Sequence, residues 1–386
     1  MNLVYRDKDI IFGKKDLELL YSIKNMPAKM GSTSKNKDSD THLDMDFYIS
    51  EGSGMIQINP LLPLDFLYEN GHGAGTTGQT WDVHHNEFSE FLNNFNFKRI
   101  LEVGGGHGKL SSINLQSNKF TETWTILEPS LDDHQELTDD RIKYIQGFFS
   151  LDIKNKFNDL SAIVHSHLFE HLYDPIQFLD DAFSILNKEG LVMMSVPNLK
   201  YMLNNNHANA IMFEHSYYAS EEYIEYMFLS KNFELLKKKY FKNHSIFYCF
   251  KKKIRQNKEQ ILKPDQYALN KKLFLNYINH IKEMVSQINI KKNKFSKNQT
   301  FIFGAHIFSQ ILLSMGIDEK KIFCVLDNDS KKINKRLYGT SLKIESPEVL
   351  RNINEPCIIL NAGNYNQEIK KQINDNINNS SIFIEM

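Results

Sequence analysis

The 386-residue chain has few cysteines, no long apolar run and almost no net charge. Its three cysteines (Cys249, Cys324 and Cys357) include no closely spaced pair, which argues against a disulfide framework and a thiolate zinc site. A run of about 18 apolar residues is missing, as is an apolar stretch near the N-terminus, so we expect neither a membrane span nor a signal peptide. A formal net charge of −1 gives no field that attracts nucleic acid. We therefore expect a cytoplasmic protein, monomeric or homodimeric, that acts on a small molecule.

The length of the chain predicts several domains, because one compact core rarely organises so many residues. Apolar residues make up 41% and charged residues 24% of the sequence, as in globular proteins. Apolar side chains recur at helical spacing over 265–290, which indicates a connecting helix. We expect four segments, namely a small N-terminal domain at 1–80, a core at 81–255, the connecting helix and a hinge at 256–297, and a second domain at 298–386.

Short β-rich runs alternate with helical or loop segments through the middle of the chain. We expect strands at 99–103, 124–127, 143–146, 162–165 and 191–196, and a late strand at 246–250. This alternation predicts an α/β fold with a doubly wound, mainly parallel sheet. A second Rossmann-like α/β unit begins with a strand at 301–303 and contains a strand that ends at Asp327.

The most specific motif is the glycine-rich turn that follows the first of these strands, with Gly104, Gly105, Gly106 and Gly108. A backbone without Cβ atoms can bend sharply and approach a ligand closely, at the edge of a parallel sheet where such folds bind ligands. The next strand ends at Glu128 and Pro129, where an acidic side chain can accept hydrogen bonds from both hydroxyls of a ribose. The pattern predicts a cofactor that contains a nucleoside.

The spacing of the glycines indicates which nucleoside-containing cofactor is bound. Gly-x-Gly-x-Gly differs from the Gly-x-Gly-x-x-Gly of dinucleotide sites. Glu102, at the end of the strand, would repel a diphosphate but suits a cofactor that carries an ammonium and a sulfonium group, so we favour S-adenosyl-L-methionine. His167, at the end of the fourth strand, is expected to border the cofactor. The alternative is an NAD-linked oxidoreductase that uses Asp327 as the ribose-binding acid of the second unit.

Four motifs, in their order and spacing, resemble those of class I S-adenosylmethionine-dependent methyltransferases. They are Glu102-x-Gly-x-Gly-x-Gly108, Glu128, the segment from Glu170 to Pro175, and the pair Leu186-Asn-Lys-Glu-Gly190 and Val196-Pro-Asn198. The resemblance implies a Rossmann-like methyltransferase core and S-adenosylmethionine as the cofactor. It also implies that Phe148, after the third strand, encloses the adenine.

Other motifs resemble the family of C-methyltransferases that act on nucleotide-linked deoxysugars. They are Phe213–Tyr218, Gly304-Ala305, Val325–Asp327, Lys331, Gly339-Thr340, Ser346–Glu348, Asn361, Asn364 and Glu368-Ile369. In this family a small zinc-binding domain, a class I core and a C-terminal Rossmann-like domain follow one another, so the resemblance spans nearly the whole chain. It implies methyl transfer to a nucleotide-activated sugar destined for a polysaccharide or a natural product.

The resemblance implies three catalytic residues, Glu214, His215 and His171. His215 is expected to be the general base because imidazole titrates near neutral pH. Glu214 would orient it or bind a hydroxyl, and His171 would lie beside the active site. Substrate contacts are expected from five residues: His72, Asn198, Tyr217, Asn361 and Tyr365.

The chain departs from the family in two places. Ser50 and Ser53 stand where the family has zinc-binding cysteines, so we expect the N-terminal domain to hold no zinc, and we expect no metal elsewhere. Met212 replaces a tyrosine, and the glycine-rich stretch 71–75 replaces tyrosines of the N-terminal loop. Carbon methylation needs an enolate to be stabilised, whereas methylation of oxygen or nitrogen needs only a base and alignment. Because the tyrosines are missing, methylation of oxygen or nitrogen stays open. A non-catalytic protein that binds sugar nucleotides is a further alternative.

Two further histidines, His84 and His85, are possible sources of polar contacts in place of the missing tyrosines. A lone histidine in a helical segment is more often a surface or capping residue than a catalyst. We expect His84 and His85 to lie at the surface or at a helix cap.

Overall fold

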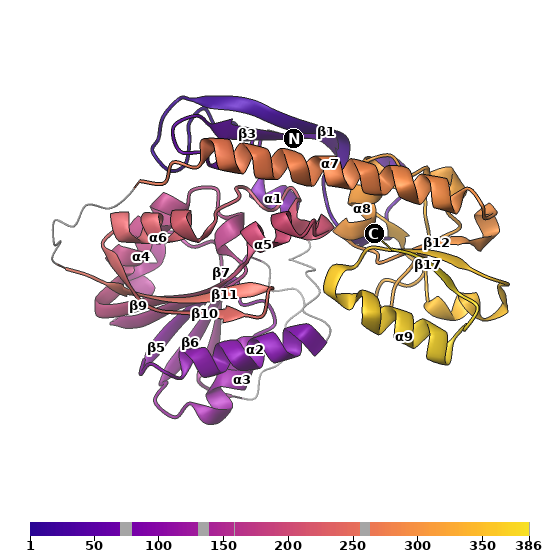
Figure 1. Ribbon diagram of the computed structural model, residues 1–386. Helices are drawn as coiled ribbons and strands as arrows, with labels where there is room; N and C mark the ends of the chain where they lie inside the picture. Colours follow the sequence, from indigo (N-terminus) through magenta and orange to yellow (C-terminus); the bar gives the residue numbers. More distant parts are fainter. Residues whose placement is uncertain (70–78, 130–138, 158, 255–262, 386) are drawn as a thin grey trace.

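The computed structural model describes residues 1–69, 79–129, 139–157, 159–254 and 263–385. Figure 1 shows a large α/β core and a smaller C-terminal α/β unit side by side, with a long helix, α7 (Tyr267–Lys292), crossing both. The strands of the N-terminal unit lie beyond this helix. The expected α/β fold, with a small N-terminal domain and two Rossmann-like units, is confirmed.

The core is a seven-stranded sheet with the order β10-β11-β9-β8-β5-β6-β7. In chain order its strands are β5 (Arg99–Val103), β6 (Thr123–Glu128), β7 (Ile142–Gln146), β8 (Leu160–Ser166), β9 (Leu186–Pro197), β10 (Phe233–Phe241) and β11 (Ser245–Lys252). The strands from β5 to β9 pair in parallel, while β11 runs antiparallel to β9 and to β10. All six strands expected here are present. The parallel strands bring their carboxyl ends to one edge of the sheet.

Helices cover both faces of this sheet, because its central strands are apolar on both sides. They are α2 (Gln79–Leu92), α3 (Lys109–Ser117), α4 (Pro175–Ile185) and α6 (Glu221–Ser230). The short helix α5 (Leu199–Asn204) packs against α7 instead. Ile100 packs with α2 and α3, whereas its neighbour Leu101 packs with α4 and α6. Asp174 caps α4 by accepting the N–H of Gln177, and Pro175 occupies the first turn.

The N-terminal unit is an antiparallel sheet of β1 (Leu17–Pro27), β3 (His42–Ser50) and β4 (Ile56–Ile58). The apolar residues of this segment show no regular alternation. The reason is that the pairing of β1 with β3 shifts register twice, between Leu19 and Tyr21 and between Ile23 and Met26. A bulge shifts which side chains face inward, so the alternation on which strand prediction depends is lost. The strands are consequently longer than the sequence indicates.

The C-terminal unit is a parallel sheet with the order β15-β13-β12-β16-β17. Its elements are β12 (Thr300–Phe303), α8 (Ile307–Ser314), β13 (Val325–Leu326), β15 (Ile344–Glu345), β16 (Cys357–Leu360), α9 (Asn366–Asn376) and β17 (Ile382–Ile384). The strand that was expected to end at Asp327 is limited to Val325 and Leu326. Ile322 and Cys324 are buried before the strand begins, which explains the apolar run in the sequence.

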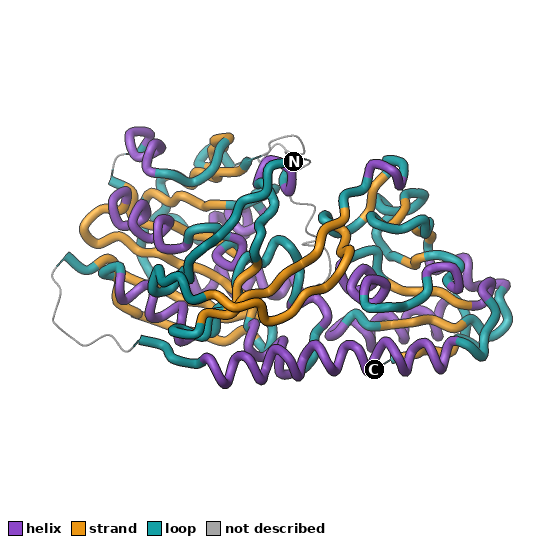
Figure 2. The backbone as a smooth tube through the Cα atoms, turned by 90° about the horizontal axis from the view of Figure 1, so that it is seen from above, coloured by secondary structure: helices purple, strands orange, loops and turns teal. Residues whose placement is uncertain are grey.

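The two ends of the chain are joined. A short strand β2 (Ser32–Thr33) pairs with β14 (Arg336–Leu337), and Arg336 binds both carboxylate oxygens of Asp40, at 2.5 and 2.7 Å. Seen from above, the long strands of the N-terminal unit run beside α7 toward the C-terminal unit (Figure 2). One apolar cluster contains residues of the N-terminal unit, α7 and the C-terminal unit, so these parts share a core.

Candidate active site

The glycine turn lies at the carboxyl end of β5, in the centre of the core sheet. Gly104, Gly106 and Gly108 have φ values of 70°, 50° and 69°, in the left-handed region that favours glycine. The N–H of Gly106 donates to Oε2 of Glu128 at 3.0 Å, so the acid at the end of β6 is fastened to the turn. A Cβ atom at Gly106 would meet open space, whereas one at Gly105 would lie 2.7 Å from Cδ of Glu102. The turn is therefore packed beneath and open above.

Glu102 is buried under this turn. Its Oε2 accepts the indole N–H of Trp124 at 2.7 Å. Burial raises the pKa of Glu102 to about 8, and the nearby carboxylate of Glu128 adds to this shift. The structure thus places Glu102 where it supports the turn from below, and its expected contact with an ammonium group stays a prediction.

The remaining residues expected at the cofactor lie around the same edge. Pro129 follows β6, and its carbonyl accepts the side-chain N–H of Gln146 at 3.1 Å. Phe148 follows β7 and is 49% exposed, so its ring is available to a ligand. His167 follows β8, and its Nε2 lies 2.9 Å from Oγ of Ser245. Burial lowers the pKa of His167 to about 3, which keeps the ring neutral.

These residues fit a nucleoside cofactor with an amino-acid tail. Gly106 presents an open backbone, and Glu128 stands where a ribose would be held. Gly104–Gly108 would hold the tail, Glu128 the ribose hydroxyls and Phe148 the base.

A second group of polar side chains lies at the same edge of the sheet. Glu170 and His171 follow β8, and Glu214 and His215 lie in the connection after β9. His171 lies between two carboxylates, with Nε2 3.8 Å from Glu170 Oε1 and Nδ1 3.7 Å from Glu214 Oε2. The rings of His171 and His215 are 5.2 Å apart. The three expected catalytic residues are therefore brought together.

His215 has a defined orientation. Its Nδ1 lies 2.9 Å from the carbonyl oxygen of Ala210, an acceptor, so this nitrogen carries the proton. Nε2 of the neutral ring can then accept a proton. Burial lowers the pKa of His215, although the carboxylates of Glu170 and Glu214 act in the opposite direction.

The same residues include a set that can bind a divalent cation. One ligand atom each from Glu170, His171 and His215 lies within 4.8 Å of the other two. Two imidazoles and one carboxylate are ligands used by several divalent metals. The expectation that the protein holds no metal is therefore open to a direct test.

Sequence reasoning missed Tyr68. It lies just after α1 (Leu64–Leu67), and its hydroxyl is 3.4 Å from Nδ1 of His171. Burial and the carboxylates of Glu214 and Glu170 raise the pKa of Tyr68 well above 10, which keeps the hydroxyl protonated. No local motif marks this tyrosine, because it reaches His171 across 103 residues of sequence.

The expectation that His84 is a surface or capping residue is wrong. His84 is fully buried, and its Nε2 lies 2.8 Å from Oγ of Ser195. Its ring packs against those of Trp81 and His167. The sequence contained the signal, because His84, Phe88 and Phe91 recur at helical spacing and share one buried face. His85 is also buried, and its Nδ1 lies 2.7 Å from the carbonyl of Trp81, one turn earlier in the helix.

The expected substrate contacts are less well grouped. Asn198 caps α5 by accepting the N–H of Tyr201. Tyr217 is fully buried, and its hydroxyl donates to the carbonyl of Phe169, an arrangement that serves packing. His72 lies outside the described residues.

The two expected contacts from the C-terminal unit lie just beyond β16. Nδ2 of Asn361 is 3.3 Å from Sδ of Met284 in α7. Burial raises the pKa of Tyr365, and the side chain of Thr80 at the start of α2 is close enough to act in the opposite direction. Tyr365 therefore lies near the helix that precedes the glycine turn.

The two serines that stand in place of zinc ligands, Ser50 and Ser53, form a local hydrogen-bond network. Ser53 donates its hydroxyl to Oδ1 of Asp9 at 2.9 Å and accepts the N–H of Met55. Ser50 Oγ accepts the N–H of Ser53 at 3.0 Å. All three polar side chains are buried, so hydrogen bonds hold this turn closed.

The second Rossmann-like unit repeats one feature of the first. Oδ2 of Asp327 accepts the N–H of Ala305 at 2.8 Å, as Glu128 accepts that of Gly106. Lys332 lies 3.1 Å from the same oxygen, and the N–H of Asp329 donates to the other. Both carboxylate oxygens of Asp327 are thus bound by residues of its own unit.

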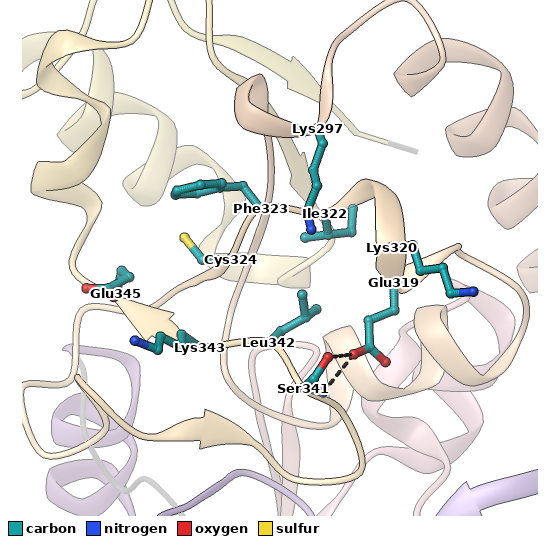
Figure 3. A pocket seen from close by; sticks show the side chains of 10 residues that line it. All are labelled: Lys297, Glu319, Lys320, Ile322, Phe323, Cys324, Ser341, Leu342, Lys343 and Glu345. Carbon is teal, nitrogen blue, oxygen red and sulfur yellow. Dashed lines mark hydrogen bonds between the residues drawn. The ribbon is translucent and has the colours of Figure 1, made fainter. Parts of the chain in front are cut away.

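The C-terminal unit also contains a cavity of about 460 Å³ (Figure 3). Its lining includes Lys297 and the segment Ile322–Cys324, which precede β12 and β13. Ligands of open α/β sheets bind at the carboxyl ends of strands. This cavity lies at the opposite ends and is separate from the glycine turn.

Comparison with known proteins agrees with the site. A family model described as a methyltransferase domain matches residues 82–238, and one described as a C-methyltransferase C-terminal domain matches residues 252–386. The chain thus contains a methyltransferase domain, for which S-adenosylmethionine is the cofactor. More particularly, it joins a methyltransferase domain to a second domain of the C-methyltransferase type. No curated protein matches the sequence.

Solved structures share part of this fold at low similarity. The 1,6-didemethyltoxoflavin-N1-methyltransferase of Burkholderia thailandensis, solved with S-adenosylhomocysteine, is 11% identical, with a TM-score of 0.37 over 52% of this chain and 96% of that one. The methyltransferase domain of a bacterial Hen1 is 18% identical, with a TM-score of 0.36 over 45% and 100%. Among the helices of the described ranges, not one combines the length and apolar character that crossing a bilayer requires.

Proposed function

We propose that the protein transfers a methyl group from S-adenosylmethionine to a carbon atom of a nucleotide-activated sugar, with His215 as the general base. The observation that carries this proposal is the position of His215 and His171, 5.2 Å apart, at the sheet edge that also bears the glycine turn. The description of the second family model, a C-methyltransferase domain, supports carbon as the acceptor.

The chemistry needs a base, an oxyanion partner and a methyl donor. The cofactor, when bound, supplies an electrophilic methyl group on a positively charged sulfur. Nε2 of His215 removes a proton from the sugar carbon beside a ketone, and the resulting electron pair forms the new carbon–carbon bond. The bound cofactor would give up its methyl group and would keep the electrons of the carbon–sulfur bond as a neutral thioether, so the transfer balances. The proton stays on His215 until it passes to solvent.

Tyr68 and His171 are placed to stabilise the enolate oxygen. The Tyr68 hydroxyl is protonated and can donate a hydrogen bond. His171 stands between Glu170 and Glu214, with its ring nitrogens 3.8 and 3.7 Å from their carboxylate oxygens, and can present an N–H to the enolate oxygen. Tyr68 therefore supplies a hydroxyl despite the replacement of the family's tyrosine by Met212, and Glu214 orients His171 in addition to neighbouring His215.

The test is incubation with methyl-labelled S-adenosylmethionine and a panel of nucleotide-linked sugars, with and without a 4-keto group. We expect label in a carbon-bound methyl group of a keto sugar, which carbon NMR of the product identifies. A methyl group on oxygen or nitrogen would contradict carbon transfer but leave the substrate class standing. Transfer to lipid or protein alone would overturn the substrate class.

The same experiment separates the enzyme from a non-catalytic binding protein. Calorimetry with S-adenosylhomocysteine and with each nucleotide sugar measures binding directly. Binding of both without turnover of any acceptor would favour the non-catalytic protein. Tyr68→Phe is the informative variant, because it removes one hydroxyl near His171 and nothing else. We expect it to lower kcat while the affinity for S-adenosylhomocysteine stays the same.

A further inference from the structure

Arg6, near the start of the chain, contacts both of the loops that carry the candidate catalytic histidines. Its Nη2 donates to the carbonyl of Tyr173 at 2.6 Å and to Oγ of Ser216 at 3.1 Å, and its Nη1 donates to the carbonyl of Ser216 at 2.8 Å. Tyr173 lies two residues after His171, and Ser216 immediately follows His215. One guanidinium therefore connects the two loops, whose contact residues Tyr173 and Ser216 lie 43 positions apart in the sequence.

Further contacts between the loops run through the same residues. The N–H of Ser216 donates to the carbonyl of Glu170 at 3.0 Å, and its hydroxyl donates to the carbonyl of Leu172 at 2.5 Å. Arg6 thus completes a set of hydrogen bonds whose acceptors are main-chain carbonyls beside His171. The planar fork of a guanidinium presents several N–H donors in a fixed geometry, so one side chain can bind two carbonyls at once.

Arg6 is itself held in place by the N-terminal unit. Its backbone N–H donates to Oδ1 of Asn59 at 2.9 Å, and its carbonyl accepts from Nδ2 of Asn59 at 2.8 Å. Just before Asn59, the N–H of Ile58 donates to the carbonyl of Ser216 at 3.0 Å. Burial lowers the pKa of Arg6 to about 10, so the guanidinium is still charged at neutral pH.

We propose that Arg6 is a positioning residue for methyl transfer, which fixes the separation and relative orientation of His171 and His215. The N-terminal unit, which has no zinc ligands of the family's kind, contributes to the active site through this side chain. The inference rests on the proposed function for its catalytic meaning. The geometric part, that Arg6 sets the surroundings of the two imidazoles, stands independently of the acceptor.

The variants Arg6→Gln and Arg6→Lys test the proposal, with Arg351→Gln as the control because Arg351 is exposed and pairs with Glu348 on its own helix. Lysine keeps the positive charge of Arg6 but lacks the planar guanidinium. We therefore expect Arg6→Lys to fold without the hydrogen bonds that connect the two loops. We expect both Arg6 variants to lower kcat about 10- to 100-fold, as small misplacements of catalytic groups do. Their affinity for S-adenosylhomocysteine, measured by calorimetry, should stay within about twofold of the wild type, since the partners of Arg6 lie outside the glycine turn.

NMR titration of the histidine side chains gives a readout that needs no acceptor. We expect the resonances and titration midpoints of His171 and His215 to change in both Arg6 variants and those of His280 to stay constant. Wild-type kcat together with unchanged titrations in a folded variant would overturn the proposal. If the wild-type protein methylates no sugar, the proposed function fails, and unchanged His171 and His215 titrations would still overturn the role of Arg6. If Arg6→Gln does not fold, Arg6→Lys decides.

Discussion

The imidazole rings of His171 and His215 meet edge to face, with centroids 5.2 Å apart and an interplanar angle of 83°. Their surroundings differ in a way that assigns different tasks. His171 is flanked by two carboxylates, whereas His215 is oriented by a main-chain carbonyl and has its pKa lowered by burial. The fixed Nδ1–H of His215 leaves its Nε2 to accept a proton, which supports His215 as the base.

The pH dependence of methyl transfer follows from the lowered pKa of His215. The base is active when neutral, so kcat should fall only as the pH drops below the ordinary histidine value of 6.5. We expect a flat profile from neutral to mildly alkaline pH and an acid limb below 6.5. His215→Gln should lower kcat about 100- to 10,000-fold and remove this limb. An acid limb that persists in His215→Gln would assign the base to another residue.

Glu102 should make the protein less stable as the pH rises. Its pKa is about 8 in the folded protein, against an ordinary glutamate value of 4.5. Between these values the unfolded chain loses a proton that the folded protein retains, so the free energy of unfolding falls with increasing pH. Glu102→Gln keeps an acceptor for Trp124 and cannot ionise. Melting temperatures from pH 5 to 9 should therefore decline less steeply in Glu102→Gln than in the wild type, and parallel curves would contradict this account.

Glu128 and Asp327 occupy corresponding places in the two Rossmann-like units and form a matched pair of variants. We expect Glu128→Gln to weaken S-adenosylhomocysteine binding about 10- to 100-fold, the worth of a hydrogen bond to a charged group. Asp327→Asn should leave that affinity unchanged, because Asp327 is bound by Ala305, Asp329 and Lys332 of its own unit. Calorimetry decides, and a comparable loss in Asp327→Asn would place the cofactor in the second unit.

Much of the core could be predicted because its signals are local. The strand β5, the glycines after it and Glu128 all lie within the 30 residues from Arg99 to Glu128. Tyr68 and Arg6 could not be found in this way. Tyr68 approaches His171, and Arg6 contacts the loops that carry both histidines, each from a segment more than 100 residues away, and neither belongs to a recognisable motif. Their roles exist only after the N-terminal unit has packed on the core.

The N-terminal unit should be stable without metal. Ser53→Ala breaks two buried hydrogen bonds, to Asp9 and to Met55, and we expect it to lower the free energy of unfolding by about 1–3 kcal/mol. The exposed Ser39→Ala serves as the control. Urea unfolding measures both, and the transition of the wild type should not move when a chelator is added. A chelator-sensitive transition would show that a bound metal contributes to folding.

The pairing of Asp40 with Arg336 joins residues that lie 296 positions apart. On the ribosome, Asp40 emerges long before its partner has been synthesised, so β2 has nothing to pair with until nearly the whole chain is made. The core between them can fold first, because the hydrogen bonds of its sheet lie within residues 99–252. The sheet of β1, β3 and β4 is local as well, so it is β2 that must wait for β14. A nascent chain that stalls before Arg336 would carry a finished cofactor fold and an N-terminal unit without its final anchor.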